Sequence, residues 1–376
     1  MDSQPAGGCS PLSLALGNSK DKAMLLEDKN IRIVSFRDIS IDDPFFYSLK
    51  EDYKEFPEWF KKKSDERAYV IEGDDGSIQA FLYLKEEFGK IDDVNPPLPQ
   101  DNYLKIGTFK INAHGTKLGE RFIKKAFDYA ISQNIRKIYV TIFPKHEWLI
   151  SLLIRFGFVE YGEKVTRNGR EIVLLKDFDH FTGNIELDYP IVNLNKRQYL
   201  LSIYPDYHTK LFPDSKLMNE DFNIIDDVSH TNSISKIYIC KMRGVESLRY
   251  GDLLVIYRTS DQQGPAWYRS VATSFCMVKE IKTKYDFSDL EDFLAYSFSR
   301  SVFSEEELIH FYKTWNQLIV INFTYNIAFP KRIIRKTLIE DIGISQDDYW
   351  GFLSLTKDQV LHIAELGGVN ESLIVY

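Results

Sequence analysis

The chain has 376 residues, of which 44% are hydrophobic, and its formal net charge is -8 at pH 7. This length exceeds what one core usually organises, so we expect two domains or three. The acidic total excludes a protein that a global positive field holds on nucleic acid or on an anionic membrane, so any such binding needs a local basic patch.

The cysteines and the apolar runs narrow the class further. Cys9, Cys240 and Cys276 lie far apart, with no spacing typical of a metal site, so we expect no metal and a reducing, cytoplasmic location. No apolar run approaches the roughly 18 residues that a membrane span needs, so we expect no membrane partner. The oligomeric state stays open.

Residues 1–29 mix Gly, Ser, Pro and Asp without apolar periodicity, which predicts a flexible tail. A first domain is expected over residues 30–180. It starts with the strand "IRIVSF" and the helical, aromatic stretch "PFFYSLKEDYKEFPEWFKKK". A hairpin of "RAYVIEG" and "IQAFLYLKEE" follows, and "KIDDVNPPLPQDN" then reads as a Pro-rich loop.

Strands and helices alternate in the rest of this domain. The strand "YLKIGTFKIN" precedes a helix over residues 117–133, in which Leu118, Phe122, Ala126 and Ala130 recur every four residues. The strand "IRKIYVTIF", the helix "HEWLISLLIRFG" and the strands "FVEYGEK" and "EIVLLKDF" complete the unit. This order predicts an α/β fold, a mixed sheet with flanking helices.

The second domain, expected over residues 181–376, is richer in short β runs. These are "KIYICKM", "DLLVIYRT", "AWYRSVATSFCMVKEI" and "QLIVINFTYNIAF". Helices are expected at "DLEDFLAYSF", "SEEELIHFYKTW" and "TKDQVLHIAELGG", the last with glycine at its end. The pattern predicts an α+β unit, a β-barrel or curled sheet with peripheral helices.

The turn before the 117–133 helix has features of a phosphate site. A helix N-terminus carries free N–H groups and a partial positive charge. Gly115 permits a close backbone approach, Gly119 removes a Cβ from the first turn, and Lys117 adds a positive charge. Two glycines at a helix start also make an ordinary tight connection, so both interpretations stay open at this point.

The order of elements around this turn resembles the GNAT superfamily of acyl-CoA-dependent N-acetyltransferases. That family writes the turn as R/Q-x-x-G-x-G/A and ends a later helix in a Gly-Phe pair, which here is Gly157-Phe158. His114 and Lys117 depart from the family's turn, whereas Gly119 matches its last glycine. The resemblance covers roughly residues 30–178 and implies acetyl-CoA as cofactor, between two strands that part at their C-terminal ends. The residues implied to bind it are Ile111, Asn112, His114, Gly115, Thr116, Lys117, Leu118 and Gly119.

The catalytic acid and base are not assigned by the sequence. Many family members place a tyrosine acid where this chain has Leu153, and an aliphatic side chain cannot donate a proton. His146 before the helix, Tyr139 on the second strand and Tyr161 are weak candidates. For each of them a structural role is the alternative: a cap or surface position for His146, and core packing for Tyr139.

The stretch "KIYICKMRGVESLRYGDLLVIYRT" and the long strand after it resemble PUA-like barrels, especially the ASCH and EVE branches. In those barrels a Gly-Asp turn precedes a core strand, and the resemblance implies a basic groove for RNA or a modified nucleotide. Lys241, Arg243 and Arg249 are the candidate phosphate contacts and Trp267 the candidate stacking residue. A run of charge is also typical of a plain solvated face.

Together these features predict an acetyl-CoA-dependent N-acetyltransferase that acts on an amine, such as RNA or an RNA-linked amine like aminoacyl-tRNA presented by the PUA-like domain. One alternative is an RNA-binding regulatory protein whose GNAT-like fold senses acyl-CoA without turnover. The other is an acetyltransferase for protein lysines or small amines.

Overall fold

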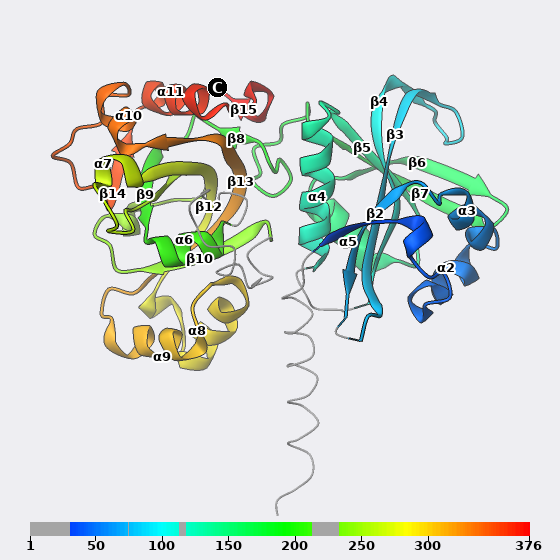
Figure 1. Cartoon of the computed structure of the whole chain (residues 1–376), viewed down its shortest axis with the longest axis horizontal. Coiled ribbons are helices and arrows are strands. Elements are labelled where there is room, and N and C mark those ends of the chain that lie inside the picture. The colour runs from blue at the N-terminus through cyan, green and yellow to red at the C-terminus, as the bar shows by residue number, and fades with distance from the viewer. Residues whose placement is uncertain (1–30, 74, 113–117, 213–232) are drawn as a thin grey trace, which may run out of the picture.

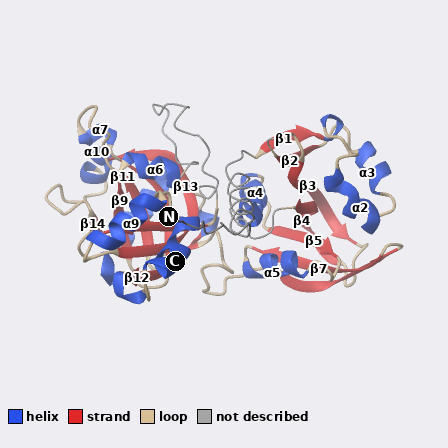
Figure 2. Cartoon of the chain, turned by 90° about the horizontal axis from the view of Figure 1, so that it is seen from below, coloured by secondary structure: helices blue, strands red, loops and turns tan. Residues whose placement is uncertain are grey.

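The computed structural model describes residues 31–73, 75–112, 118–212 and 233–376 (Figure 1). These residues form two large β-sheets. The last strand of the first sheet ends at Asp177, and the first strand of the second sheet begins at Gln198. Helix α4 lies between them, and Figure 2 shows the same arrangement from below. The predicted mixed α/β architecture is therefore confirmed, while the domain boundaries at residues 30 and 181 stay a prediction.

The first sheet has seven strands in the order β1-β2-β3-β4-β5-β7-β6, and of its pairs only β4 with β5 is parallel. Its strands are β1 (Arg32–Ser35), β2 (Arg67–Glu72), β3 (Ile78–Ile91), β4 (Leu98–Ile111), β5 (Lys137–Ile142), β6 (Val159–Thr166) and β7 (Gly169–Asp177). Its helices are α2 (Tyr47–Asp52), α3 (Phe56–Lys62), α4 (Leu118–Ser132) and α5 (Glu147–Arg155).

Different helices pack on the two faces of the first sheet. Successive residues of a strand point to opposite faces, so each strand contributes to both. Val70 and Phe81 pack with the aromatic residues of the α2–α3 region. Ile71 and Leu82 pack on the other face with α4 and α5. The predicted apolar stripe of α4 is fully buried in this second cluster. Burying one such large side chain stabilises the fold by about 1.5–3 kcal/mol, so this face fixes α4 on the sheet.

The predicted Pro-rich loop is wrong over most of its length. Strand β3 continues to Ile91 and β4 already starts at Leu98, so that only residues 92–97 connect them. Ile91 pairs with Leu98, and both side chains are buried in a small cluster with Tyr103. Burial of these apolar side chains and cross-strand pairing outweigh the local preference for a loop.

The second sheet has six strands in the order β10-β13-β12-β11-β9-β14, and here only β11 with β9 is parallel. Its strands are β9 (Gln198–Ile203), β10 (Ser235–Cys240), β11 (Leu253–Arg258), β12 (Val271–Thr283), β13 (Ile319–Ile334) and β14 (Phe352–Leu355). Two short parallel strands, β8 (Val192–Asn193) and β15 (Ile374–Val375), lie beside it. The helices are α6 (Pro205–Leu211), α7 (Ala266–Arg269), α8 (Leu290–Ser297), α9 (Glu305–Thr314), α10 (Arg335–Glu340) and α11 (Lys357–Gly367).

The second sheet is curled, and an apolar cluster packs on each of its two faces. The strand pairs within the described residues leave β10 and β14 at opposite ends of the order. Closure into a barrel therefore stays a prediction. Cys240 and Cys276 are free and buried within this unit, and burial raises the pKa of both thiols, that of Cys240 to about 12. None of the helices in the described ranges is long and apolar enough to cross a membrane.

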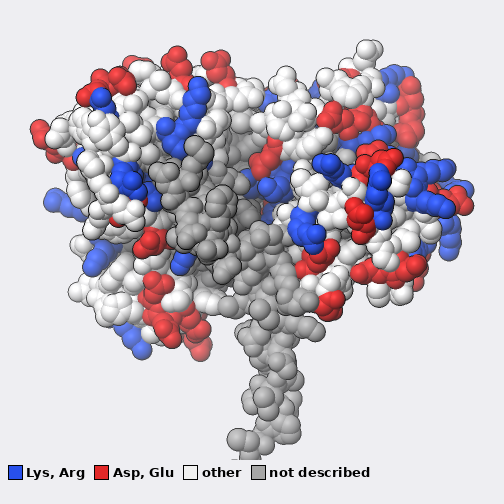
Figure 3. Space-filling model, viewed as in Figure 1, with Lys and Arg blue, Asp and Glu red and all other residues white. Residues whose placement is uncertain are grey.

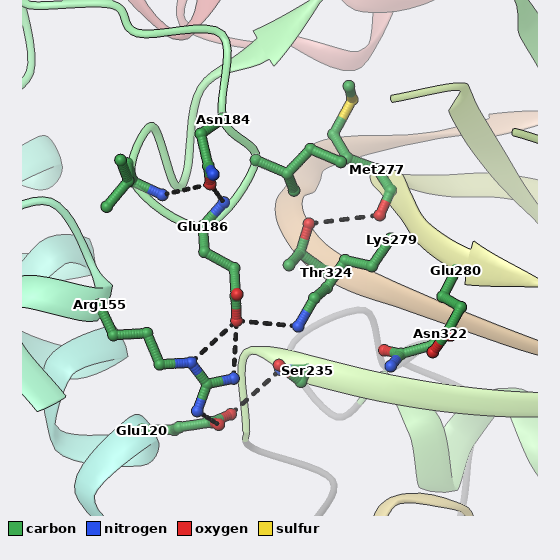
Figure 4. Close-up of polar contacts among 12 residues, drawn as sticks. Glu120, Arg155, Asn184, Glu186, Ser235, Met277, Lys279, Glu280, Asn322 and Thr324 are labelled. Atoms are coloured by element: carbon green, nitrogen blue, oxygen red, sulfur yellow. Dashed lines mark hydrogen bonds and ion pairs between the residues drawn. The ribbon is translucent and has the colours of Figure 1, made fainter. Parts of the chain in front are cut away.

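Hydrogen bonds and ion pairs join the two units through α4 and α5 (Figure 4). Glu120 of α4 accepts a hydrogen bond from the backbone N–H of Ser235 at 3.2 Å and lies 3.4 Å from Arg155. Arg155 also donates to Glu186 at 2.6 Å, and Lys279 of β12 donates to the same carboxylate at 2.8 Å. These contacts hold the start of α4 against the second sheet.

Two side chains from beyond residue 180 complete the core of the first sheet. Tyr189 and Ile234 are fully buried in the cluster that contains α4 and α5. The Tyr189 hydroxyl donates to the carbonyl of Tyr325 in β13 at 2.9 Å. The first core therefore depends on residues that follow the first sheet in the chain.

Candidate active site

Strands β4 and β5 part from each other in the first sheet. Their parallel register covers only four pairs, from Tyr103–Lys137 to Ile106–Val140. Beyond these pairs β4 continues to Ile111 and β5 to Ile142. The β5-facing edge of β4 after Ile106 is thus without a strand partner among the described residues. An extended chain can use the N–H and C=O groups of such an edge.

A bulge at Gly107 marks the point where the strands part. Opposite it, β3 residues Tyr83 and Leu84 pair with Thr108 and Ile106, so that Gly107 has no partner in the β3–β4 register. A Cβ on Gly107 would lie 2.7 Å from the Tyr83 ring, which is too close for any side chain. Glycine therefore lets β4 lie close against the Tyr83 ring at this bulge, and the pairing of β4 with β5 ends directly before it.

A cavity of about 700 Å³ opens where the strands part. This volume falls in the range of sites that hold small molecules and cofactors. The floor comes from β4, β5 and β7, one wall from α2 and α3, and another from the start of α5. The residues of β4 and β5 that line it are Lys105, Ile106, Gly107, Thr108, Phe109, Lys110, Ile111, Val140, Thr141 and Ile142, followed by Asn112.

A buried carboxylate stands in the floor of this cavity. Glu171 of β7 is only 3% exposed and accepts a hydrogen bond from the Tyr53 hydroxyl, which comes from the segment between α2 and α3. Burial, followed by the hydrogen bond to Glu171, raises the pKa of Tyr53 well above its usual value. Tyr53 therefore keeps its proton at neutral pH and holds Glu171 in place as a donor.

A second polar group lies where α2 meets the start of α5. The Asp52 carboxylate is 8% exposed, forms an ion pair with Lys145 and lies 3.3 Å from His146 Nε2. Glu55 accepts two hydrogen bonds from the Asn168 side chain, at 2.8 and 3.0 Å, and the Asn168 bonds lower the pKa of Glu55. Asp52, His146, Glu55 and Asn168 all line the cavity.

The structure separates the three predicted catalytic candidates. His146 lines the cavity. Tyr139 is fully buried, donates its hydroxyl proton to Glu87 and packs in the small cluster with Tyr103. Tyr161 donates to the Pro97 carbonyl at 3.0 Å. Neither tyrosine is among the residues that line the cavity.

Sequence reasoning missed Glu171 and Tyr53. In β7 the residues at alternate positions, Glu171, Val173 and Leu175, share one face, and Val173 is fully buried. A carboxylate on the buried face of a strand is costly unless it has a hydrogen bond or an ion pair. The position of Glu171 in the two-residue alternation was therefore the signal that could have identified it. Leu153, at the position where the family has its tyrosine acid, is fully buried in the core below α5.

The predicted phosphate turn is only partly visible. His114, Gly115, Thr116 and Lys117 lie outside the described residues. Ile111 and Asn112 line the cavity, and the N–H of Asn112 bonds to the Gln79 carbonyl at 2.9 Å. Leu118, the first residue of α4, is fully buried in the core.

Both motif glycines have packing roles. A Cβ on Gly119 would lie 2.5 Å from Leu152 and 3.1 Å from Trp148, so the glycine lets α5 approach α4 closely. Gly157, of the Gly-Phe pair, has a φ of +83°, and a Cβ there would meet the Leu187 carbonyl. Glu120, which would repel a phosphate from the first turn, is directed to Ser235 and Arg155 instead. The role of Gly119 in cofactor binding stays a prediction.

The predicted nucleic-acid residues of the second sheet do not form one group. Lys241, Arg243 and Arg249 lie between β10 and β11, where Arg249 donates to the Leu248 carbonyl at 2.8 Å. Trp267 lies on α7, which ends two residues before Val271, and Val271 pairs with Arg258 at the far end of β11. The six residues of β11 put its two ends about 17 Å apart. On the face seen in Figure 3, basic and acidic side chains are interspersed over both units.

Solved structures similar to this chain include N-acetyltransferases and ASCH proteins. ASCH from Zymomonas mobilis is 10% identical with a TM-score of 0.32 and covers 45% of this chain and 94% of its own. A putative phosphinothricin N-acetyltransferase is 18% identical with a TM-score of 0.31, covering 39% and 97%. NAA60 from Arabidopsis thaliana in complex with acetyl-CoA is 14% identical with a TM-score of 0.29, covering 39% and 99%.

The chain is similar to both kinds of protein. These are the two kinds that the sequence resemblance names, and each solved chain matches over nearly its whole length but over less than half of this one. No protein-family model and no curated protein matches the sequence. The described residues contain no group of three or more His, Cys, Asp or Glu side chains placed to hold a metal ion.

Proposed function

We propose that this protein is an N-acetyltransferase that takes its acetyl group from acetyl-CoA and transfers it to an amine in the cavity of the first sheet. The observation that carries this proposal is the parting of β4 and β5 above a buried carboxylate. The opening gives access for an extended cofactor chain, and the carboxylate gives a proton acceptor where the amine would react.

The residues present fit the cofactor. The β5-facing edge of β4 from Gly107 to Ile111 would pair with the amide groups of the pantetheine chain as an added strand does. The start of α4 would orient the diphosphate, since a helix of 15 residues carries free N–H donors at its N-terminus. When bound, the coenzyme would supply the acetyl group as a thioester, whose C–S bond breaks as the acceptor amine forms the new N–C bond.

Glu171 would accept the proton that the amine loses. It lies on the cavity floor, and the Tyr53 hydroxyl holds one of its oxygens. His146, beside Asp52 at the start of α5, would return a proton to the departing sulfur, because it is the imidazole that lines the cavity. In this proposal orientation of the two reactants contributes most of the rate enhancement.

The acceptor's macromolecular class stays a prediction. Helices α2 and α3, which form one wall of the cavity, lie on the side of the first sheet away from the second sheet (Figures 1 and 2). The geometry therefore gives little support to an RNA or aminoacyl-tRNA presented by the second unit. A cytoplasmic location also belongs to the proposal.

A second candidate is an RNA-binding regulatory protein whose first unit senses acyl-CoA without turnover. The observation that favours it is the buried Leu153, because no proton donor occupies the position of the family's tyrosine acid. Its distinguishing property is coenzyme binding without transfer.

Calorimetry with acetyl-CoA tests the site itself. Thr141 lines the opening between the strands, and Thr141→Trp would fill it, whereas Thr141→Val keeps its size. We expect binding by the wild type and by Thr141→Val and at least a tenfold loss in Thr141→Trp, about 1.4 kcal/mol. Equal affinity in all three proteins would place the coenzyme elsewhere.

Labelled acetyl-CoA then tests turnover. After incubation, label on protein, RNA or small amines is separated and counted. Transfer to any amine supports the enzyme, while coenzyme binding with no labelled product supports the sensor.

A further inference from the structure

The cavity of the first sheet is lined by both carboxylates and amines. Carboxylates of Asp52, Glu55 and Glu171 lie around Tyr53, and all three raise the pKa of its hydroxyl. Toward the other end of the β4–β5 register the cavity is lined by the amines of Lys85, Lys105 and Lys164 and by the carboxylate of Glu87. Lys164 also pairs with Glu171 in the β6–β7 register.

Most of these charges already have partners. Lys145 neutralises Asp52, and Arg167 lies 3.1 Å from Glu55. Lys85 pairs with Glu87 at 2.6 Å. The remaining pair is that of Lys164 with Asp93. Lys110, on the α2 side, donates to the Phe45 carbonyl and to Ser48.

Lys105 is the exception among the lysines at its end of the cavity. It has no ion pair within 4 Å and no hydrogen bond with any described residue, and its ammonium lies 5.2 Å from the centre of the Tyr139 ring. Burial lowers its pKa, and the nearby charge of Glu87 only partly opposes this. An anion in the cavity would relieve the cost of this partly buried, incompletely compensated charge.

Glu171 is the corresponding exception at the acidic end, because its described partner is the neutral Tyr53. Lys105 and Glu171 share a face of the sheet: Lys105 pairs with Tyr139, Tyr139 pairs with Leu175, and Glu171 lies four residues from Leu175 on β7. Strand spacing puts their Cα atoms about 13 Å apart along the strands and about 10 Å across them. Two long side chains that line one cavity at this separation leave a gap of small-molecule length.

Resting on the proposed acetyltransferase function, we propose that the acceptor is a small amine that also carries a carboxylate, which Lys105 binds while Glu171 faces the amine. Such a molecule brings an anion to Lys105 and an amine to Glu171. A polyamine would leave Lys105 without an anion and add repulsion. A phosphate diester chain would bring more negative charge than one free lysine neutralises.

The test compares acceptors that differ only in the carboxylate. A series of ω-amino carboxylates from glycine to ε-aminocaproate is assayed beside the carboxamide of each, with acetyl-CoA as donor. A charge-assisted hydrogen bond contributes about 1.5–3 kcal/mol, so the best carboxylate should exceed its carboxamide in kcat/KM by about 10-fold to 100-fold. In Lys105→Met this ratio should fall toward one, and Lys105→Arg should restore most of it.

Lys85→Met is the matched control, because Lys85 lines the same end of the cavity but is paired with Glu87. It should keep the preference for the carboxylate. Equal rates with carboxylate and carboxamide in the wild type, or faster transfer to aminoacyl-tRNA than to every amino carboxylate, would overturn the inference while leaving the acetyltransferase intact. A uniform loss of rate in Lys105→Met, with the ratio unchanged, would also overturn it.

Calorimetry with the same amino carboxylates separates this inference from the proposed function. If no acceptor is acetylated, Lys105-dependent binding of an amino carboxylate still supports the cavity assignment and only the transfer step fails. Absence of both binding and acetylation of every amino carboxylate would overturn the acceptor assignment.

Discussion

Lys176 of β7 carries a charge that the fold buries at a cost. Its side chain is 2% exposed, donates to the Leu187 carbonyl and lies 5.7 and 5.5 Å from the rings of Phe127 and Phe178. Burial lowers the pKa of Lys176 from its usual 10.5 to about 8. A difference of about 2.5 pH units corresponds to about 3.4 kcal/mol between the charged and neutral forms.

This cost makes stability depend on pH in a defined window. Between about pH 8 and pH 10.5 the unfolded chain still holds the proton that folded Lys176 has lost, so the free energy of unfolding rises with pH. Lys176→Met has no such proton. The wild type should therefore gain about 2 kcal/mol relative to Lys176→Met between pH 7 and pH 9.5.

Urea unfolding of both proteins at several pH values measures this difference, and NMR titration of the labelled lysine nitrogen measures the pKa itself. Lys137→Met is the control, because a hydrogen bond to Asp101 raises the pKa of Lys137 and its contribution stays constant below pH 10. A stability difference between wild type and Lys176→Met that does not change with pH would refute the reasoning.

Two further predictions concern the site and its support. Glu171→Gln should lower kcat by about 100-fold or more with coenzyme affinity unchanged, since it removes the proton acceptor but leaves the strand edge intact. Steady-state rates and calorimetry measure the two effects. An unchanged rate would mean that another group is the base. Gly119→Ala should lower the free energy of unfolding by about 1–3 kcal/mol, because its Cβ would lie 2.5 Å from Leu152. Thermal unfolding measures it, and an unchanged midpoint would mean that Leu152 moves aside freely.

The predictions that the structure confirms rest on the local spacing of apolar residues. The four-residue spacing from Leu118 to Ala130 required no knowledge of the rest of the chain, and all of these side chains are buried. The helices α5, α8, α9 and α11 were also predicted from their local sequence. Strands β9 and β14 were missed, since β9 pairs in parallel with β11, and both depend on partners more than 50 residues away in the chain.

The candidate site was predicted less completely, because it depends on a departure from regular pairing. The parting of β4 and β5 begins at the bulge at Gly107, and a glycine in a strand has several possible causes. The contact of Tyr53 with Glu171 joins positions 118 residues apart. Their meeting follows from the sheet order, in which β7 lies beside β5 and below α2–α3.

The completion of the first core by Tyr189 and Ile234 limits how the chain can be cut. A fragment ending at residue 180 would keep all seven strands of the first sheet but would lose two of the side chains that fill the space beneath α4. Apolar side chains of α4 and α5 would then be exposed to water, and we expect such a fragment to self-associate. No single cut keeps both halves whole, because Ile234 follows β9 of the second sheet in the chain, so the two halves have to be expressed together.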